Sequence, residues 1–405
     1  MAQIIPQLSF SKQALTNLAG GLAEYLDDLD SMHSKFFRDI SVWWKWYEAI
    51  PKVKIKTTPW SHASNVIVPV IRAMSDSIIA REYALIHSHN RIWTGSTQNE
   101  SMREFAIQVP NFLNWAARDN EFDMLGATLD WSTEKTVIGE SVLGARYEIR
   151  ERYVLIPHQG KRIVRAVVKR GPQVEHIPRE QILWDPGRSI QDSLVVSRQS
   201  FLSYTDMVRF TQLSGWDKQA VEEAKEFPET NSPAWSIAKE REQAAGRTLG
   251  GVNRTRLPHD VRTVWIDWPM VKGMNAVPEV QGVEDKSVNI VVTFHVRSRK
   301  ILSITADPLG LGRKPFYHAV HRKRSGRATG EGIAKILEMG QRIASTLVNQ
   351  SMDAITLANN LILKTTDAKI ASGNFSIGKP LLVGTMGDVE VMGLPKQILP
   401  DIALL

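Results

Sequence analysis

Residues 326–360 read GRATGEGIAKILEMGQRIASTLVNQSMDAITLANN, and the prediction of the architecture starts from this stretch. From Gly332 to Asn360 it contains no proline, and its apolar residues recur with the period of an α-helix. A helix of this span would be roughly 40 Å long, whereas an average globular helix has only about 11–12 residues. Because the predicted helix has a broad apolar stripe and few charges, we expect other helices to enclose it.

Composition limits the class of protein. The chain has 405 residues, of which 43% are hydrophobic, enough for a sizeable core and two or three substructures. It contains no cysteine, which excludes disulfides and thiolate metal sites and fits folding in a cytosol. The N-terminus lacks the pattern of a secretory signal, and no apolar run approaches the roughly 20 residues of a membrane helix.

The positive charge is distributed unevenly along the sequence. Residues 297–327 hold nine Lys or Arg and one acidic residue, Asp307, so this segment carries a net +8 while the whole chain carries +7. Such a segment indicates a nearby polyanion, although a solvated loop is the commoner cause of a charge run. Four of its residues could each neutralise a phosphate without reading a base. These are Arg322, Lys323, Arg324 and Arg327.

Periodicity assigns the remaining elements. Helices are expected over residues 11–50 and 100–135, and another helix is expected to continue from the loop at Pro59 and Ser61 to about Ile86. After Gly139, alternating apolar and polar residues predict strands and a hairpin that turns at residues 158–160. Residues 215–250 look like exposed helix, residues 261–305 like strands, and short strands are expected after Asn360. The aromatic cluster of Trp43, Trp44, Trp46 and Tyr47 indicates either a core or a subunit interface.

No enzyme signature is present. Gly326, Gly330 and Gly332 resemble a phosphate-binding loop in composition only, because no Gly-Lys-Ser or Gly-Lys-Thr follows them. His318 and His321 have helix-compatible spacing but lack a metalloprotease pattern and a third ligand nearby, so they are expected to be polar loop residues. We therefore predict no catalytic residue, no metal site and no cofactor.

Three stretches share the order and texture of one known family. They are residues 315–360, a segment with a Pro-Trp, Ala-Ser-Asn and Pro pattern, and a strand with an Asp-Pro turn and a helix. This combination resembles the portal proteins, which are the head-to-tail connectors of tailed bacteriophages. The matching positions are Pro315, Phe316, Gly330, Gly332, Gln341, Asn349, Gln350 and Asp353, then Pro59, Trp60, Ala63, Ser64, Asn65 and Pro69, then Asp185, Pro186 and Asp206.

The resemblance implies an α+β, portal-like fold with an α/β wing, a two-helix stem and a mixed α/β clip. It places the wing at residues 1–214, a first stem helix within 215–254, the clip at 255–328, a second stem helix at 329–359, and a return to the wing at 360–405. The family continues into a tunnel loop and a helical crown. The sequence stops before either, so we expect the crown to be absent from this chain.

The resemblance also implies a function. It implies a non-enzymatic ring, usually of twelve subunits, at one capsid vertex of the virion, assembled in the host cytoplasm and without membrane contact. The ring would conduct double-stranded DNA, without sequence specificity, during packaging and ejection. The implied partners are the terminase large subunit, a head-to-tail adaptor, and the major capsid and scaffold proteins.

A closed ring needs heterologous interfaces, in which one surface of a subunit meets a different surface of the next. The candidates for packing between neighbouring stems are Ile336, Leu337, Ile343, Leu347 and Val348. Scattered charges on the same helix suit DNA that slides, so Lys335 and Arg342 join the four cations above as channel candidates. Which helix face would line a channel stays open.

Two other classes of protein stay open as alternatives. A metal-dependent DNA-processing enzyme would use dispersed carboxylates, with the basic segment as its electrostatic footprint. Metal-dependent activity on plasmid DNA, abolished by changing a carboxylate, would favour it. The third class is a monomeric α/β binding protein.

Overall fold

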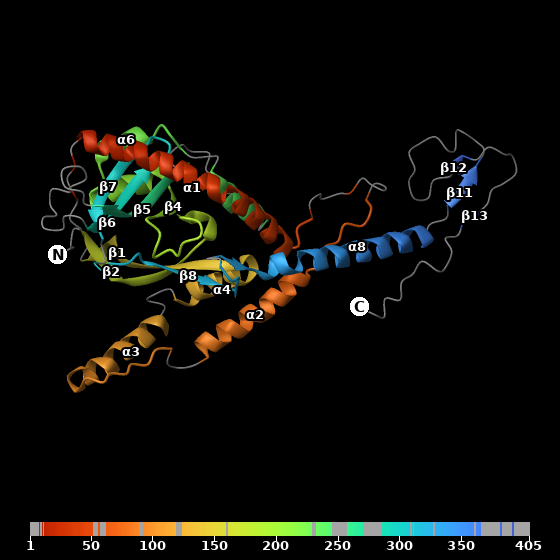
Figure 1. Ribbon diagram of the computed structural model, residues 1–405, viewed down its shortest axis with the longest axis horizontal. Coiled ribbons are helices and arrows are strands. Elements are labelled where there is room, and N and C mark those ends of the chain that lie inside the picture. Colours follow the sequence, from red (N-terminus) through yellow and green to blue (C-terminus); the bar gives the residue numbers. More distant parts are fainter. Residues whose placement is uncertain are drawn as a thin grey trace. The chain divides into compact units, whose positions relative to one another are not determined.

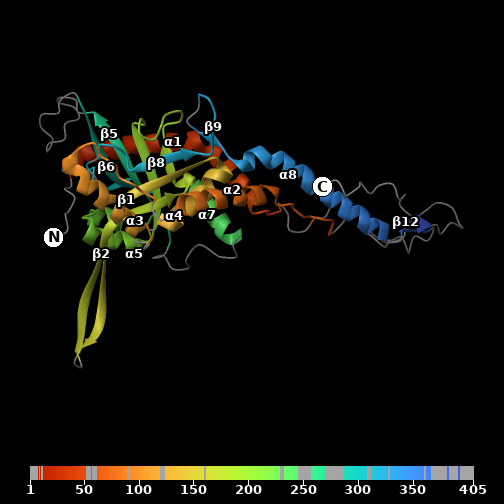
Figure 2. The same ribbon diagram turned by 90° about the horizontal axis from the view of Figure 1, so that it is seen from below.

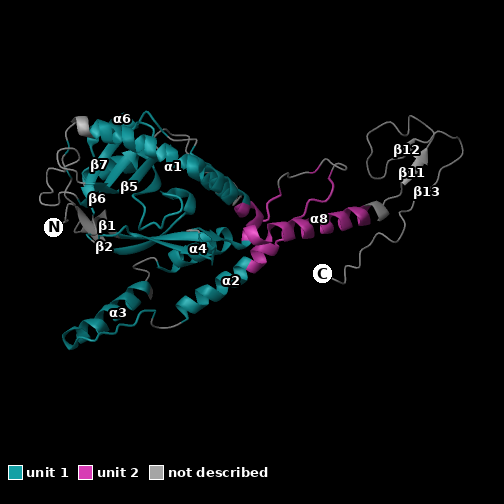
Figure 3. Ribbon diagram, viewed as in Figure 1, with its two compact units in different colours: residues 1–42, 75–333 teal, residues 43–74, 334–405 magenta. Residues whose placement is uncertain are grey.

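The computed structural model describes most of the first 359 residues, and the chain is a mixed α+β protein (Figure 1). It forms two compact units, of which unit 1 comprises residues 1–42 and 75–333 and unit 2 comprises residues 43–74 and 334–405 (Figure 3). The described residues are 8, 10, 12–51, 56, 62–88, 92–118, 124–158, 161–228, 232–244, 257–269, 286–307, 310, 312–326, 329–359, 362–365, 381–382 and 391–392.

A five-stranded antiparallel sheet of order β3-β4-β5-β6-β7 forms one layer of unit 1. Helix α1 (Lys12–Tyr47) runs along this sheet (Figure 1). Because the strands are rich in β-branched and aromatic residues, their inner positions form a core. The strands are β3 (Ile182–Trp184), β4 (Val195–Leu202), β5 (His259–Pro269), β6 (Ser287–His295) and β7 (Lys300–Ala306).

A second sheet has the order β2-β1-β8 and contains the long hairpin of β1 (Glu140–His158) and β2 (Lys161–Ile177). Strand β8 (Phe316–Val320) pairs only with the first residues of β1, so the hairpin continues past it as a two-stranded ribbon (Figure 2). The two sheets share a buried apolar cluster in which the rings of Trp265 and Phe316 meet edge to face at 4.6 Å.

The helices complete unit 1 around these sheets. Helix α4 (Met124–Ile138) is followed by Gly139 and then at once by β1. The others are α2 (Val70–His87), whose first residues belong to unit 2, then η1 (Glu100–Met102), α3 (Arg103–Arg118), η2 (Arg179–Gln181), α5 (Tyr204–Leu213), α6 (Lys218–Ala224) and α7 (Pro233–Ala244). The short pair β9 (Arg322–Lys323) and β10 (Gly330–Glu331) leads into the long helix.

The long helix predicted from the sequence is confirmed as α8 (Ile333–Asn359), which has 27 residues and a length of roughly 40 Å. Unit 2 combines it with residues 43–74 and with the short strands β11 (Ile362–Thr365), β12 (Leu381–Leu382) and β13 (Val391–Met392). The predicted first helix, the hairpin and these late strands are present as well.

The predicted portal-type division of the chain stays a prediction, and the two compact units divide the chain differently. Residues 215–254 hold the short helices α6 and α7 among their described residues, where one stem helix was expected. The expected boundary between wing and clip falls inside one sheet, because β4 pairs with β5 from Val195↔Ile266 to Leu202↔His259. Strand pairing across long sequence separations is not visible in a linear pattern, which explains the difference.

Candidate functional site

One side of α8 carries four polar side chains that hold an extended segment of unit 2. Backbone N–H groups of the segment donate to side-chain oxygens at every fourth residue of the helix, over distances of 2.7–3.1 Å. We call this arrangement the polar ladder. Its four bonds join Ser64 to Asp353 (2.8 Å), Val66 to Asn349 (2.7 Å), Val68 to Ser345 (3.1 Å) and Ile71 to Gln341 (2.7 Å).

The ladder fits because two repeats have nearly equal lengths. Four residues of an α-helix rise about 6 Å, and two residues of an extended chain span about 6.6 Å. Alternate amides of the segment therefore meet successive turns of the helix. The alternation ends at Val70, whose N–H group donates instead to the carbonyl oxygen of Val68 at 2.9 Å, and the last rung moves to Ile71 in the first turn of α2.

Two rungs of the ladder bind their partners through a second group. The Nδ2 group of Asn349 donates to the carbonyl oxygen of Val66 at 2.9 Å, so its amide satisfies both polar groups of that residue. The Nε2 group of Gln341 donates to the carbonyl oxygen of Trp46 at 2.9 Å, and this glutamine is fully buried. Gln341 thereby joins the end of α1 and the start of α2 to α8 within unit 2.

The opposite side of α8 is apolar and exposed. Residues at spacings of three and four form a stripe there, and a half turn separates this stripe from the ladder. The members and their exposed fractions are Ile336 (41%), Met339 (64%), Ile343 (55%) and Leu347 (43%). Of the five residues predicted to pack between stems, Ile336, Ile343 and Leu347 lie in this stripe, whereas Leu337 and Val348 are half-buried.

The cations predicted to meet DNA fall into separate groups. Arg322, Lys323 and Arg324 lie in and just after β9 of unit 1 and are exposed, but Arg324 pairs with the carboxylate of Glu331. Arg327 lies outside the described residues, as do Pro59 and Trp60. Lys335 and Arg342 belong to unit 2. The Arg342 guanidinium lies 5.9 Å from the centre of the Trp46 ring, which gives it a packing partner.

Glycines at the start of α8 allow two backbone segments to touch. A Cβ added to Gly332 would lie 2.1 Å from the carbonyl oxygen of Val137, and one added to Gly330 would lie 2.3 Å from that of Gly139. Gly139 has φ +110° and faces the Gly332 nitrogen at the same crossing. The Gly-x-Gly sequence therefore provides close backbone approach, a role that the comparison with phosphate loops did not predict.

A buried ion network forms the polar centre of unit 1. The Arg179 Nε group donates to Glu140 at 2.7 Å, and the guanidinium stacks 4.0 Å from the centre of the Trp184 ring. His318 Nε2 lies 3.2 Å from the same carboxylate. Burial alone would raise the pKa of Glu140, but Arg179 and His318 outweigh it and hold the pKa at about 2.

A second carboxylate, Glu134 of α4, extends this network. It accepts hydrogen bonds from the Arg179 backbone N–H group at 2.9 Å and from Ser141 at 2.8 Å, and it lies 2.8 Å from His176 Nε2. Burial lowers the pKa of His176, but the bond and charge of Glu134 raise it overall. The network joins α4, both strands of the hairpin, η2, β3 and β8, so it holds the two sheets together.

The histidine pair noted in the sequence does not share a ligand. His318 faces Glu140, whereas the His321 backbone N–H group donates to the carbonyl oxygen of Gly139 at 2.8 Å. Within the described ranges, no group of three or more His, Cys, Asp and Glu side chains is placed to hold a metal ion.

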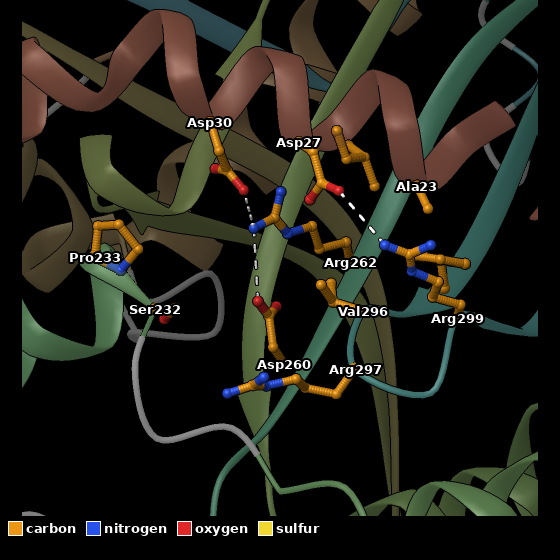
Figure 4. Close-up of a pocket in the computed structure, with 12 residues that line it drawn as sticks. Ala23, Asp27, Asp30, Ser232, Pro233, Asp260, Arg262, Val296, Arg297 and Arg299 are labelled. Carbon is orange, nitrogen blue, oxygen red and sulfur yellow. Dashed lines mark hydrogen bonds and ion pairs between the residues drawn. The ribbon is translucent and has the colours of Figure 1, made fainter. Parts of the chain in front are cut away.

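A charged pocket of about 370 Å³ lies between α1, the start of α7 and strands β5 and β6 (Figure 4). Arg262 donates to Asp30 at 2.7 Å and lies 3.6 Å from Asp260, and Asp27 lies 3.9 Å from Arg299. Burial by itself lowers the pKa of Arg262, but the two aspartates raise it overall. Three arginines and three aspartates line the pocket, so its charges balance, and their pairing fastens α1 to the sheet.

No protein-family model matches the sequence, and no curated protein matches it either. In the part of the chain that the structure describes, none of the helices combines the length and the apolar character that crossing a bilayer requires.

Proposed function

We propose that the chain is a subunit of a portal-like ring that conducts double-stranded DNA through one vertex of a phage capsid. The observation that carries the proposal is the two-sided character of α8. One side is fixed by the polar ladder, and the opposite side leaves Ile336, Met339, Ile343 and Leu347 exposed. A helix of roughly 40 Å with such a stripe is suited to packing beside the same helix of a neighbouring copy.

The ladder supports the same proposal from the sequence side. Three of its rungs, Gln341, Asn349 and Asp353, are positions at which the chain resembles the portal family, and Ser64 and Pro69 of the bound segment are positions of a second matching stretch. The bonded residues are 270 to 289 positions apart in the sequence, yet hydrogen bonds join the two stretches. Two separate points of resemblance thus belong to one structural feature.

The partners of the proposed ring follow from the resemblance. They are the terminase large subunit, a head-to-tail adaptor, the major capsid and scaffold proteins, and double-stranded DNA bound without sequence preference. The ring would be non-enzymatic and would need no cofactor.

The native mass of the purified chain, measured by light scattering with images of the same peak, tests the ring. We expect closed rings of about twelve copies with a central hole. A 45.5 kDa monomer at every concentration, under conditions in which the chain is folded, would contradict the proposal as it applies to this chain.

The substitution Leu347→Asp tests the face that assembles. It puts a charge on the exposed stripe, so we expect loss of the ring while the circular dichroism spectrum and the unfolding temperature of the protomer stay nearly unchanged. The matched control is Thr346→Asp, which adds the same charge at an exposed position a quarter turn away. If the Leu347→Asp variant stays fully oligomeric, this stripe is not the interface.

A further inference from the structure

Helix α3 is held on its inner side by the segment that precedes it. The buried side chain of Asn114 accepts hydrogen bonds from the backbone N–H groups of Ile92 at 2.7 Å and Trp93 at 3.0 Å, and its Nδ2 group donates to the carbonyl oxygen of Trp93 at 2.8 Å. A Cβ atom added to Gly95 would clash with the carbonyl oxygen of Ala106, so the segment and the helix touch through their backbones. These contacts fix which side of α3 faces outward.

The outer side of α3 is apolar. Five large apolar side chains, the first of them in η1, recur there at spacings of three and four residues and lie along one side of the helix. Each is 49–64% exposed, and helix α3 lies at the edge of unit 1 (Figure 3). We call these residues the α3 stripe. They are Met102, Phe105, Val109, Phe112 and Trp115.

The composition of the α3 stripe is typical of an interface between proteins. Phe, Trp and Met are enriched in such interfaces, whereas Lys, Glu and Asp are depleted. A helix that lies on a membrane surface has a similar apolar side, but its polar side is rich in Lys and Arg. Helix α3 contains two arginines, one glutamate and no lysine. The stripe therefore favours a protein partner over a lipid surface.

The exposed apolar side chains are concentrated in two places. More than half of the large apolar side chains that are exposed in the described part of the chain lie on α8 or between Met102 and Trp115. The α8 stripe runs from Ile336 to Leu347. Its four side chains are about half exposed and smaller than aromatic ones, so they offer roughly 500 Å² at most. One partner in a stable interface buries about 800 Å², so the α8 stripe alone is too small.

The α3 stripe supplies the missing area. Its three aromatic side chains are each more than half exposed and offer roughly 250–400 Å², to which Met102 and Val109 add. The two stripes together therefore approach the area of about 800 Å² that one partner buries. They lie in different compact units, α3 in unit 1 and α8 in unit 2. A subunit that uses both stripes would hold each of its units against a neighbour.

We infer that the α3 stripe is a second contact between copies of this chain, and the inference rests on the proposed ring. In a closed ring each contact joins two different surfaces, so the stripe of one copy packs on a surface of the next copy other than that copy's α3 stripe. Phe105 and Trp115 are the aromatic anchors of this contact, because a few such residues carry most of the affinity of an interface.

Single introduced thiols test the contact, because the chain contains no cysteine. Phe105→Cys puts a thiol on the α3 stripe, and the matched control Asn111→Cys puts one at an exposed position of the same helix, a third of a turn away. In the oligomeric fraction, we expect a maleimide reagent to label Phe105→Cys about tenfold more slowly than Asn111→Cys. After dilution to the monomer, the two rates should agree within about threefold.

A charge on the stripe tests the same contact by native mass. We expect Phe105→Asp to raise the protein concentration at which half of the chain is assembled by about tenfold or more, measured by light scattering. Its circular dichroism spectrum and unfolding temperature should stay nearly unchanged, because Phe105 is exposed in the single copy. Asn111→Asp adds the same charge outside the stripe and should change that concentration less than about threefold.

These measurements separate the contact at α3 from the ring. Rings in which Phe105→Cys and Asn111→Cys react equally fast, or in which Phe105→Asp has no effect, would overturn the inference and leave the ring intact. Disulfide-linked dimers of Phe105→Cys in place of rings would support a contact between copies at α3 but contradict the ring, because the stripe would then meet itself. Binding of the monomer to vesicles of phosphatidylcholine and phosphatidylserine, lost in Phe105→Asp, would also overturn the inference, because the stripe would then face lipid.

Discussion

The polar ladder of unit 2 and the buried ion network of unit 1 use polar side chains in different ways. On α8, side chains spaced by four residues each accept a backbone N–H group, so the partners are groups that every residue except proline has. Around Arg179, charged side chains pair with one another and are almost completely enclosed. The ladder depends on backbone geometry, whereas the network depends on the identity of each member.

Because of this difference, we expect substitutions in the network to lower the free energy of unfolding more than substitutions in the ladder. Removing one partner from a buried ion pair leaves the other charged and without compensation, whereas removing one neutral acceptor leaves an amide that water can reach if the site is half-exposed. The following substitutions test the contrast, beginning with the network.

The largest effect is expected for Arg179→Ala. It leaves Glu140 in a buried site without its main charge partner and removes the stacking on Trp184. We expect the free energy of unfolding to fall by about 3–5 kcal/mol, measured by urea titration. Arg209→Ala serves as the control, because Arg209 lies 4.0 Å from Asp206 at the surface and its loss should cost less than about 1 kcal/mol. Similar losses in both variants would contradict the comparison.

The second largest effect is expected for the pH dependence of the stability that the network contributes. Because the folded pKa of Glu140 is about 2, below its usual value, its charge stabilises the fold fully above pH 4.5 and less as the pH falls towards 2. The stability difference between the wild type and Glu140→Gln should be constant above pH 5 and shrink by about 1.4 kcal/mol per pH unit below 4.5. Urea titrations at pH 7, 5, 4 and 3 measure it. A difference that does not change with pH would show that Glu140 stays protonated or is not paired.

The ladder and the ion network differ in how much of each could be predicted from the sequence, and the reasons are physical. The long helix follows from periodicity, and the polar residues Gln341, Asn349 and Asp353 are visible at spacings of four or eight. Their partners are not visible, because an extended segment such as residues 64–71 has no pattern that names the helix it binds. The prediction that other helices enclose α8 did not include the difference between its two sides, of which one binds residues 64–71 and the other is apolar and exposed.

The ion network was not predicted at all. Glu134, Glu140, His176, Arg179 and His318 come from five elements, and each looks like an ordinary polar residue in its own segment. No local signal marked them, because Glu134 lies among polar neighbours in its helix and Glu140 is followed by Ser141 at the start of its strand. The Gly-x-Gly sequence at the start of α8 was noticed, but its partner Gly139 could be recognised only when the two backbone segments were seen to cross.

A moderate effect is expected for Asn349→Ala. The variant loses the acceptor of the Val66 N–H group and the donor to the Val66 carbonyl oxygen, both at the surface of unit 2. We expect a loss of stability of about 1–2 kcal/mol and faster hydrogen exchange of the Val66 amide. Gln350→Ala, a change at the exposed neighbouring residue, should alter neither by a measurable amount. Equal effects of both changes would mean that the rung contributes nothing.

The smallest effect is expected for Ser345→Ala, and it separates the two kinds of network most clearly. The hydroxyl group of Ser345 accepts from the Val68 N–H group at 3.1 Å and donates to the carbonyl oxygen of Gln341 at 2.7 Å, within its own helix. Alanine is the better helix former, so it offsets part of the lost bond, and we expect a net change below about 1 kcal/mol. Exchange of the Val68 amide should nevertheless accelerate, while exchange of Val66 and Ile71 stays slow, because each rung binds its own amide. If one substitution released all the amides together, the ladder would be a cooperative network like the one around Arg179, and the distinction between them would fail.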